Sequence, residues 1–166
     1  MIDASVLEAL RLAVFDFDGV FTDNRVWVDE SGTESVVCWR GDGLGLRRLE
    51  SVGVEPLIVS TEPSTVVAAR ARKLRVDCAH GVEHKLEVVQ AHAERRGVGL
   101  EQTAFVGNDV NDAECLRAVG LAVVPADAWP EVVPLAAWVL RRPGGRGCVR
   151  EFCDAVWHAR GGGGST

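Results

Sequence analysis

The 166-residue sequence lacks any apolar run near the length of about 20 residues that crosses a bilayer as a helix. Its first residues, 1–8, do not combine a basic stretch with an apolar core, which a secretion signal requires. Basic residues are also in deficit, 18 against 24 acidic ones, so the net charge is −6. This charge is unfavourable for binding nucleic acid or anionic lipid. We therefore expect a cytoplasmic protein with a small-molecule partner, no nucleic-acid partner and no membrane partner.

Closely spaced cysteine pairs are absent as well. The five cysteines include no C-x-x-C pair, their number is odd, and each lies in an otherwise apolar segment: Cys38, Cys78, Cys115, Cys148 and Cys153. Reduced, buried thiols are the better interpretation of this pattern. The sequence therefore predicts neither a zinc site nor a disulfide.

Neither an internal repeat nor a linker divides the chain. Its length and its 47% content of hydrophobic residues fit one packed core. We expect residues 1–160 to form a single domain. Residues 161–166 are rich in glycine and contain no core-forming side chain, so we expect a disordered tail there.

What the sequence does contain is an alternation of short apolar segments with helix-like segments. Strands are expected at 12–15, 55–60, 76–79, 102–107, 121–124 and 136–140, and helices at 43–52, 63–74, 83–96, 113–119 and 148–160. This order predicts an α/β fold, with a central parallel sheet and helices on both faces. Residues 25–28 and 35–39 flank a polar turn and predict a β-hairpin at about 24–39, either a flap over the preceding residues or plain structure.

Polar side chains follow three of the expected strands. Asp16 and Asp18 follow the first, Ser60 ends the second, and the segment 108–112 follows the strand at 102–107. Each has an ordinary alternative, since Asp18-Gly19 is a common turn and serine often caps a helix. Ligands of parallel sheets bind at the carboxyl ends of the strands. Three polar clusters at such ends therefore favour one shared site, and the paired carboxylates favour a bound cation.

Four motifs in order resemble those of the haloacid dehalogenase-like phosphatases. They are Asp16–Val20, Ser60, Lys85 at the start of a helix, and Gly107–Asp112. The resemblance covers residues from about 10 to 158. It is greatest to the branch without a cap domain, which comprises octulosonate 8-phosphate phosphatases, nonulosonate 9-phosphate phosphatases and the C-terminal module of acylneuraminate cytidylyltransferases. It implies a Rossmann-like three-layer fold with a hairpin flap after the first strand and no large cap.

The resemblance also implies a mechanism of phosphate ester hydrolysis. Asp16 would attack phosphorus to form an aspartyl-phosphate, and Asp18 would protonate the leaving oxygen and then activate water. Ser60 would hydrogen-bond the phosphoryl group, and Lys85 would place a positive charge beside it. On its own, a serine such as Ser60 is more often a strand-ending hydroxyl or a helix cap, and a lysine such as Lys85 is more often a solvated surface residue.

A magnesium ion belongs to the implied mechanism, because it lets an anionic carboxylate approach an anionic phosphate. Its expected ligands are the side chain of Asp16, the backbone carbonyl of Asp18, and Asn108 or Asp109. Asp112 is expected to support their loop or to cap the next helix. Asn108 stands where many relatives carry an acidic ligand, and an amide oxygen brings one negative charge fewer to Mg²⁺.

Substrate choice and assembly are implied by the same branch. Glu62, two positions after Ser60, resembles nonulosonate 9-phosphate phosphatases, in which this glutamate and the counterparts of Arg70 and Lys73 lie near a neighbouring subunit's substrate. The sequence therefore favours a nine-carbon over an eight-carbon sugar acid and a homotetramer, with Trp27 and Trp39 of the hairpin at the subunit contact. The alternative is a weakly active or inactive oligomerisation module.

Overall fold

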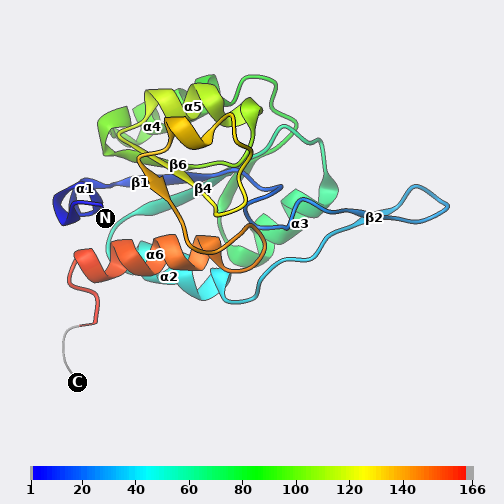
Figure 1. Ribbon diagram of the computed structural model, residues 1–166, viewed down its shortest axis with the longest axis horizontal. Coiled ribbons are helices and arrows are strands. Elements are labelled where there is room, and N and C mark those ends of the chain that lie inside the picture. Colours follow the sequence, from blue (N-terminus) through cyan, green and yellow to red (C-terminus); the bar gives the residue numbers. More distant parts are fainter. Residues whose placement is uncertain (1, 164–166) are drawn as a thin grey trace.

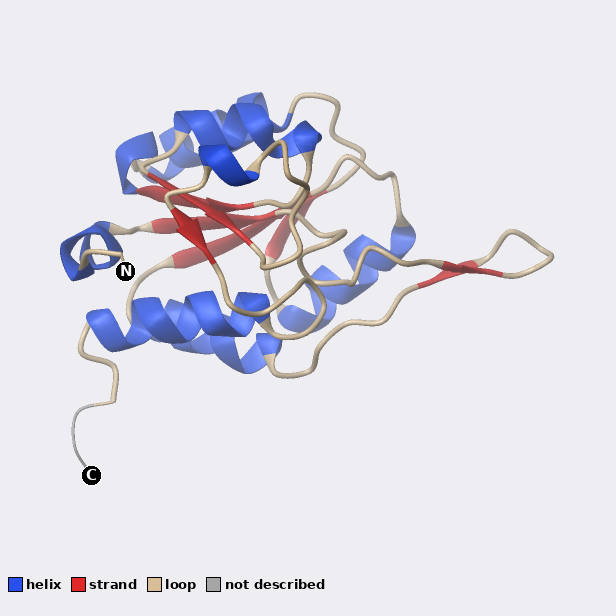
Figure 2. Cartoon of the chain, viewed as in Figure 1, coloured by secondary structure: helices blue, strands red, loops and turns tan. Residues whose placement is uncertain are grey.

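The computed structural model describes residues 2–163, and six parallel strands form its main sheet (Figures 1 and 2). The strand order is β5-β4-β1-β6-β7-β8. The strands are β1 (Leu12–Phe15), β4 (Glu55–Val59), β5 (Asp77–Ala79), β6 (Thr103–Val106), β7 (Leu121–Val124) and β8 (Trp138–Val139). The expected α/β fold with a parallel sheet is thus confirmed, and no cap domain interrupts the described residues.

Helices cover both faces of the sheet (Figure 1). Side chains alternate across β1, so that Ala13 and Phe15 pack on one face, and Leu12 and Val14 on the other. The helices against Phe15 are α2 (Asp42–Ser51), α3 (Thr65–Leu74) and α6 (Cys148–Ala159), and those on the opposite face are α4 (Lys85–Arg96) and α5 (Ala113–Ala118). These two apolar cores fix the position of β1 from both sides.

The expected hairpin follows β1 and projects away from the sheet (Figure 2). Its ladder is shorter than predicted and pairs β2 (Trp27–Val28) with β3 (Glu34–Ser35). The turn is held by Asp29, whose Oδ1 accepts hydrogen bonds from the backbone N–H groups of Ser31 and Thr33, both at 2.9 Å. Residues 36–39, which were expected to belong to the second strand, do not pair as a strand.

Several short helices complete the described part of the chain. A short helix, α1 (Ala4–Ala9), precedes β1 and has one buried side chain, Leu7. Single-turn helices occur at Leu100–Gln102, Val110–Asp112 and Val133–Leu135. After α6, the backbone N–H groups of Gly161 and Gly162 donate to carbonyls of the helix end, and the rest of the predicted tail, 164–166, lies outside the described residues. None of the described helices is long and apolar enough to span a membrane.

Candidate active site

The strand order brings the predicted polar residues to one edge of the sheet. Strand β1 lies between β4 and β6, so Asp16, Ser60 and Asn108 all leave the sheet at its carboxyl edge side by side. Backbone hydrogen bonds extend the ladder to these positions, because the N–H of Asp16 donates to Val106 at 2.9 Å and that of Ser60 donates to Ala79 at 2.9 Å. The chain reverses its strand order at this point, where ligands of open parallel sheets bind.

A cavity of about 130 Å³ opens at this edge. Six of the predicted site residues line it: Asp16, Asp18, Ser60, Glu62, Asn108 and Asp109. The sequence patterns missed three further lining residues, Asn24, Thr61 and Asn111. Thr61 and Asn111 are joined by a hydrogen bond of 3.3 Å from Asn111 Nδ2 to Thr61 Oγ1. The lining is thus almost wholly polar and carries several carboxylates.

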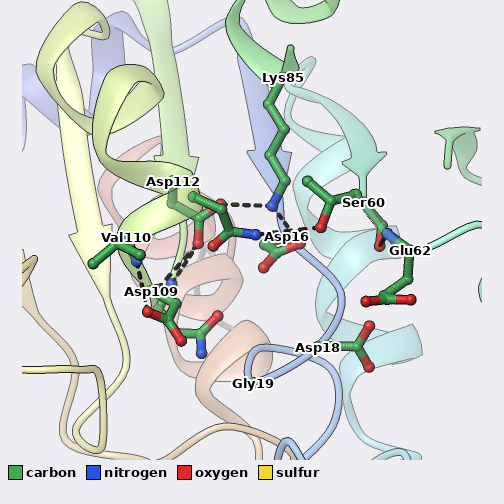
Figure 3. A network of polar contacts seen from close by, with 12 residues as sticks. Asp16, Asp18, Gly19, Ser60, Glu62, Lys85, Asp109, Val110 and Asp112 are labelled. Carbon is green, nitrogen blue, oxygen red and sulfur yellow. Dashed lines mark hydrogen bonds and ion pairs between the residues drawn. The ribbon is translucent and has the colours of Figure 1, made fainter. Parts of the chain in front are cut away.

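Lys85 lies behind this cavity and is 3% exposed. Its Nζ contacts Asp16 Oδ1 at 2.8 Å and Asp112 Oδ1 at 2.7 Å (Figure 3). Burial alone would lower the pKa of Lys85, but the two carboxylates outweigh burial and hold this pKa above its ordinary value. Lys85 is therefore a fixed positive charge that orients the Asp16 carboxylate.

Asp112 joins this lysine to the loop after β6. Its Oδ2 accepts hydrogen bonds from the backbone N–H groups of Asn108 at 2.8 Å and Asp109 at 3.3 Å, while Oδ1 binds Lys85. Its side chain is completely buried. Burial and the charge of Asp112 raise the pKa of Asp16, against the opposing effect of Lys85. The three groups carry one excess negative charge when all are ionised.

Asp18 lies on a turn whose next residue, Gly19, has to be glycine. Gly19 has a φ of +79°, and a Cβ there would lie 2.1 Å from the side-chain nitrogen of Asn108. Thr22 Oγ1 lies 3.5 Å from Asp18 Oδ1 and accepts the backbone N–H of Gly19 at 3.2 Å. Burial, followed by the charge of Glu62, raises the pKa of Asp18. A carboxyl group with a raised pKa is suited to donating a proton near neutral pH.

Asn108 has the environment of a metal ligand. Its Oδ1 is buried and has no hydrogen-bond partner among the described residues, although buried polar atoms are normally paired. The same cavity presents carboxylates of Asp16, Asp18 and Asp109. Oxygen donors of this kind are the ligands that Mg²⁺ prefers, and a cation would compensate both the unpaired oxygen and the excess negative charge. The residues present therefore fit a magnesium ion.

The loop before α6 supports the turn that carries Asp18. A Cβ on Gly144 would lie 2.0 Å from the carbonyl oxygen of Gly19, so the two backbones touch. The backbone N–H of Gly145 donates to the carbonyl of Val20 at 3.0 Å, and that of Gly144 donates to Asp127 Oδ1 at 2.8 Å. These close backbone approaches explain the pair of glycines in this loop.

Two predicted substrate-binding residues lie outside the cavity of their own chain. Arg70 on α3 donates from Nη2 to the carbonyl of Trp39 at 3.1 Å, and Lys73 is exposed on the same helix. Glu62, by contrast, lines the cavity and is exposed to solvent.

A second group of potential metal ligands lies at the opposite edge of the sheet. Glu55, Asp77 and His92 have ligand atoms within 4.8 Å of one another. Arg96 Nη2 contacts Glu55 at 2.9 Å and Asp77 at 3.3 Å, so a positive side chain already compensates these carboxylates. The site at the carboxyl edge therefore remains the candidate for catalysis.

Comparison with known proteins identifies the family. The sequence profile of haloacid dehalogenase-like hydrolases matches residues 61–148. The chain is also 34% identical over 155 residues to the 3-deoxy-D-manno-octulosonate 8-phosphate phosphatase of Escherichia coli K12, covering 93% of this chain and 82% of that enzyme. The chain belongs to the haloacid dehalogenase-like hydrolases. Its relatives show that this hydrolase acts on phosphoric monoesters, as its motifs predict.

Solved structures show the same fold for this haloacid dehalogenase-like hydrolase. The 3-deoxy-D-manno-octulosonate 8-phosphate phosphatase of Yersinia pestis superposes with a TM-score of 0.92 at 31% identity, covering 96% of this chain and 86% of that one. The corresponding enzyme of Moraxella catarrhalis, in complex with magnesium, phosphate and KDO, has a TM-score of 0.90 at 25% identity, with coverage of 94% and 90%. The expected Rossmann-like fold of this family without a large cap is confirmed.

Proposed function

We propose that the chain is a magnesium-dependent phosphatase of a phosphorylated sugar acid, with a nonulosonate 9-phosphate favoured over an octulosonate 8-phosphate. The observation that carries the proposal is one cavity that combines Asp16, Asp18 and the unpaired oxygen of Asn108, with Lys85 buried behind Asp16. The relatives named above support a sugar-acid phosphate. Glu62, two residues after Ser60, supports the nine-carbon acid.

Asp16 is the proposed nucleophile. The ammonium of Lys85 contacts Asp16 Oδ1 and so fixes the orientation of the carboxylate at the end of β1. A bond forms between an Asp16 oxygen and phosphorus while the bond from phosphorus to the ester oxygen breaks, which gives an aspartyl-phosphate. Asp18 donates its proton to the leaving oxygen. Water then attacks phosphorus, Asp18 removes a proton from it, and inorganic phosphate leaves with Asp16 restored.

Magnesium would be held by Asp16, Asn108, Asp109 and the backbone carbonyl of Asp18. When bound, it offsets the negative charges of the Asp16 carboxylate and the phosphate, and so reduces the electrostatic repulsion that opposes the attack of Asp16 on phosphorus. Ser60 follows β4 and is 1% exposed, and in the proposed mechanism its hydroxyl would donate to a phosphoryl oxygen. Asp112 binds both Lys85 and the backbone of Asn108, and so fixes the position of the proposed metal-binding loop relative to Lys85.

A homotetramer is the proposed assembly. The hairpin and the segment after it expose large apolar side chains, among them Trp27 at 74%, Val28 at 61% and Val37 at 65%. Gathered apolar exposure of this kind is typical of a protein contact. In such an assembly Arg70 and Lys73 would serve a neighbouring subunit's substrate, in agreement with their position outside their own cavity. The same hairpin favours the alternative of an oligomerisation module with little activity.

The deciding experiment is a phosphatase assay with Mg²⁺ on three substrates. These are a nonulosonate 9-phosphate, an octulosonate 8-phosphate and p-nitrophenyl phosphate, each with the wild type and with Asp16→Asn. We expect turnover of a sugar-acid phosphate by the wild type and a loss of at least a thousandfold in kcat for Asp16→Asn, about 4 kcal/mol of barrier. Undiminished activity of the variant would refute the mechanism.

The same purified protein can be used to test the proposed assembly and the proposed substrate preference. Sedimentation that shows only monomer at assay concentration would contradict the shared site. A stable oligomer that turns over none of the three substrates would favour the module. A higher kcat/KM for the eight-carbon acid would show that Glu62 does not select the nine-carbon one.

A further inference from the structure

A second cavity adjoins the one that holds Asp16. It has a volume of about 220 Å³ and shares the lining residues Asp18, Asn24 and Glu62 with its smaller neighbour. Its remaining walls come from Phe17 and from two segments, the base of the hairpin and the start of α3. These segments supply Arg25, Val26, Glu34, Val36, Ser64, Val66 and Val67. If the phosphate group binds in the smaller cavity, the rest of the substrate can extend into this larger one.

Arg25 carries the only positive charge among the described residues that line the two cavities. The other ionisable lining groups are carboxylates, in Asp16, Asp18, Glu34, Glu62 and Asp109. A ligand with a second anionic group would be repelled by most of this surface. A carboxylate in the larger cavity therefore has one favourable position, beside the guanidinium of Arg25.

Among the described residues, only Asp23 binds the guanidinium of Arg25, and it binds one edge of the group. Its Nε and Nη2 donate to Asp23 Oδ2 at 3.1 and 2.7 Å, and its backbone N–H donates to Asp23 Oδ1 at 3.3 Å. No acceptor among the described residues takes a hydrogen bond from Nη1. The edge formed by Nη1 and Nη2 can therefore receive a carboxylate with two parallel hydrogen bonds, while Asp23 holds the other edge.

We propose that Arg25 binds the carboxylate of the leaving sugar acid and so determines specificity for it from within the same chain. This inference rests on the proposed function, and it adds a cation to those that Arg70 and Lys73 of another subunit would bring. Because Arg25 is 75% exposed, the contact gains its strength from the two-point geometry rather than from burial.

The test compares each sugar-acid phosphate with its carboxyl methyl ester, which lacks the carboxylate charge and adds one methyl group. The quantity measured is the ratio of kcat/KM for the acid to kcat/KM for the ester. We expect Arg25→Ala to lower this ratio about tenfold, a typical effect of losing one charge-assisted contact. Arg25→Lys should restore only part of it, because a lysine lacks the two-point edge. Arg11→Ala is the matched control, since Arg11 is exposed at the opposite end of β1.

The outcomes separate the two hypotheses. If the wild type prefers the acid over the ester and Arg25→Ala keeps the full preference, the inference about Arg25 is wrong and the proposed function stands. Loss of the preference in Arg70→Ala with none in Arg25→Ala would assign the carboxylate to the neighbouring subunit instead. If the wild type hydrolyses p-nitrophenyl phosphate but neither sugar acid, both the proposed function and the role of Arg25 are refuted.

Discussion

Replacing Lys85 by methionine removes one charge from the most enclosed part of the site. The side chain keeps its length, while the carboxylates of Asp16 and Asp112 lose the ammonium that lies 2.8 and 2.7 Å from them. All three side chains are at least 94% buried, so water cannot replace the lost partner. The change therefore tests both the stability of the folded state and the position of Asp16, the proposed nucleophile.

The magnitude follows from the two ion pairs. With an effective dielectric constant of about 20, Coulomb's law gives about 4 kcal/mol for each pair of unit charges at about 4 Å. Dehydration of the charges offsets much of this, and breaking a buried pair typically costs roughly 3–5 kcal/mol. Since a domain is stable by only about 5–15 kcal/mol, Lys85→Met should remove a large fraction of the free energy of unfolding.

The loss should depend on pH in a defined direction. Removing Lys85 raises the pKa of Asp16 further above its ordinary value of 3.8. A carboxyl group whose pKa is raised by folding loses its contribution to stability as the pH rises through the folded-state pKa. The difference between wild type and variant should therefore be largest at pH 8 and smaller at pH 5.5, where Asp16 can take up a proton.

Urea unfolding without metal at pH 5.5 and 8, followed by tryptophan fluorescence, measures this difference. Lys73→Met is the matched control for stability, because Lys73 is the other lysine of the chain and is exposed. Equal effects of the two substitutions, or a loss at Lys85 that does not change with pH, would refute the account of the buried charges. Activity of Lys85→Met should fall by at least a hundredfold, about 2.7 kcal/mol in the barrier.

Two further predictions concern the metal loop and a second buried carboxylate. Asn108→Asp supplies the acidic ligand that many relatives carry, so the Mg²⁺ concentration that gives half-maximal activity should fall about tenfold. Titration of kcat/KM with Mg²⁺ measures this concentration. An unchanged value would show that Asn108 does not bind the ion. Burial raises the pKa of Asp42 to about 7, and no residue between 2 and 163 donates a hydrogen bond to its Oδ2. Wild type should therefore lose stability relative to Asp42→Asn by roughly 1.4 kcal/mol per pH unit between about pH 4 and 7, and parallel thermal unfolding curves over this range would contradict it.

The sequence predicted those features that depend on local pattern. Apolar segments bounded by polar residues located β1, β4 and β6 within about one residue, because buried parallel strands read as short continuous apolar runs. The convergence of Asp16, Ser60 and Asn108 followed from the general position of ligands in such sheets. The start of α3 was placed two residues early, since the helix begins at Thr65 and Ser64 caps it by accepting the N–H of Val66.

Features that depend on distant residues were beyond local pattern. The pairing of Lys85 with Asp112, 27 positions later, requires the fold of α4 against the loop after β6. Arg25 looked like an ordinary hairpin residue, and its place in a cavity depends on how the hairpin meets α3. The short ladder of β2 and β3 was likewise not predicted, because Val36 and Cys38 have the composition of a strand but pack against the core instead of pairing with β2.

The contact of Gly144 with Gly19 has a consequence for how the protein is made. The turn that presents Asp18 lies against a loop encoded about 125 positions later, and the carbonyl of Val20 is bound by both Gly145 and Cys148. The ribosome releases the first strand long before that loop exists. A nascent chain therefore carries Asp16 and Asp18, the proposed nucleophile and acid, without the loop that supports their turn, and a fragment that ends before residue 144 should have no phosphatase activity.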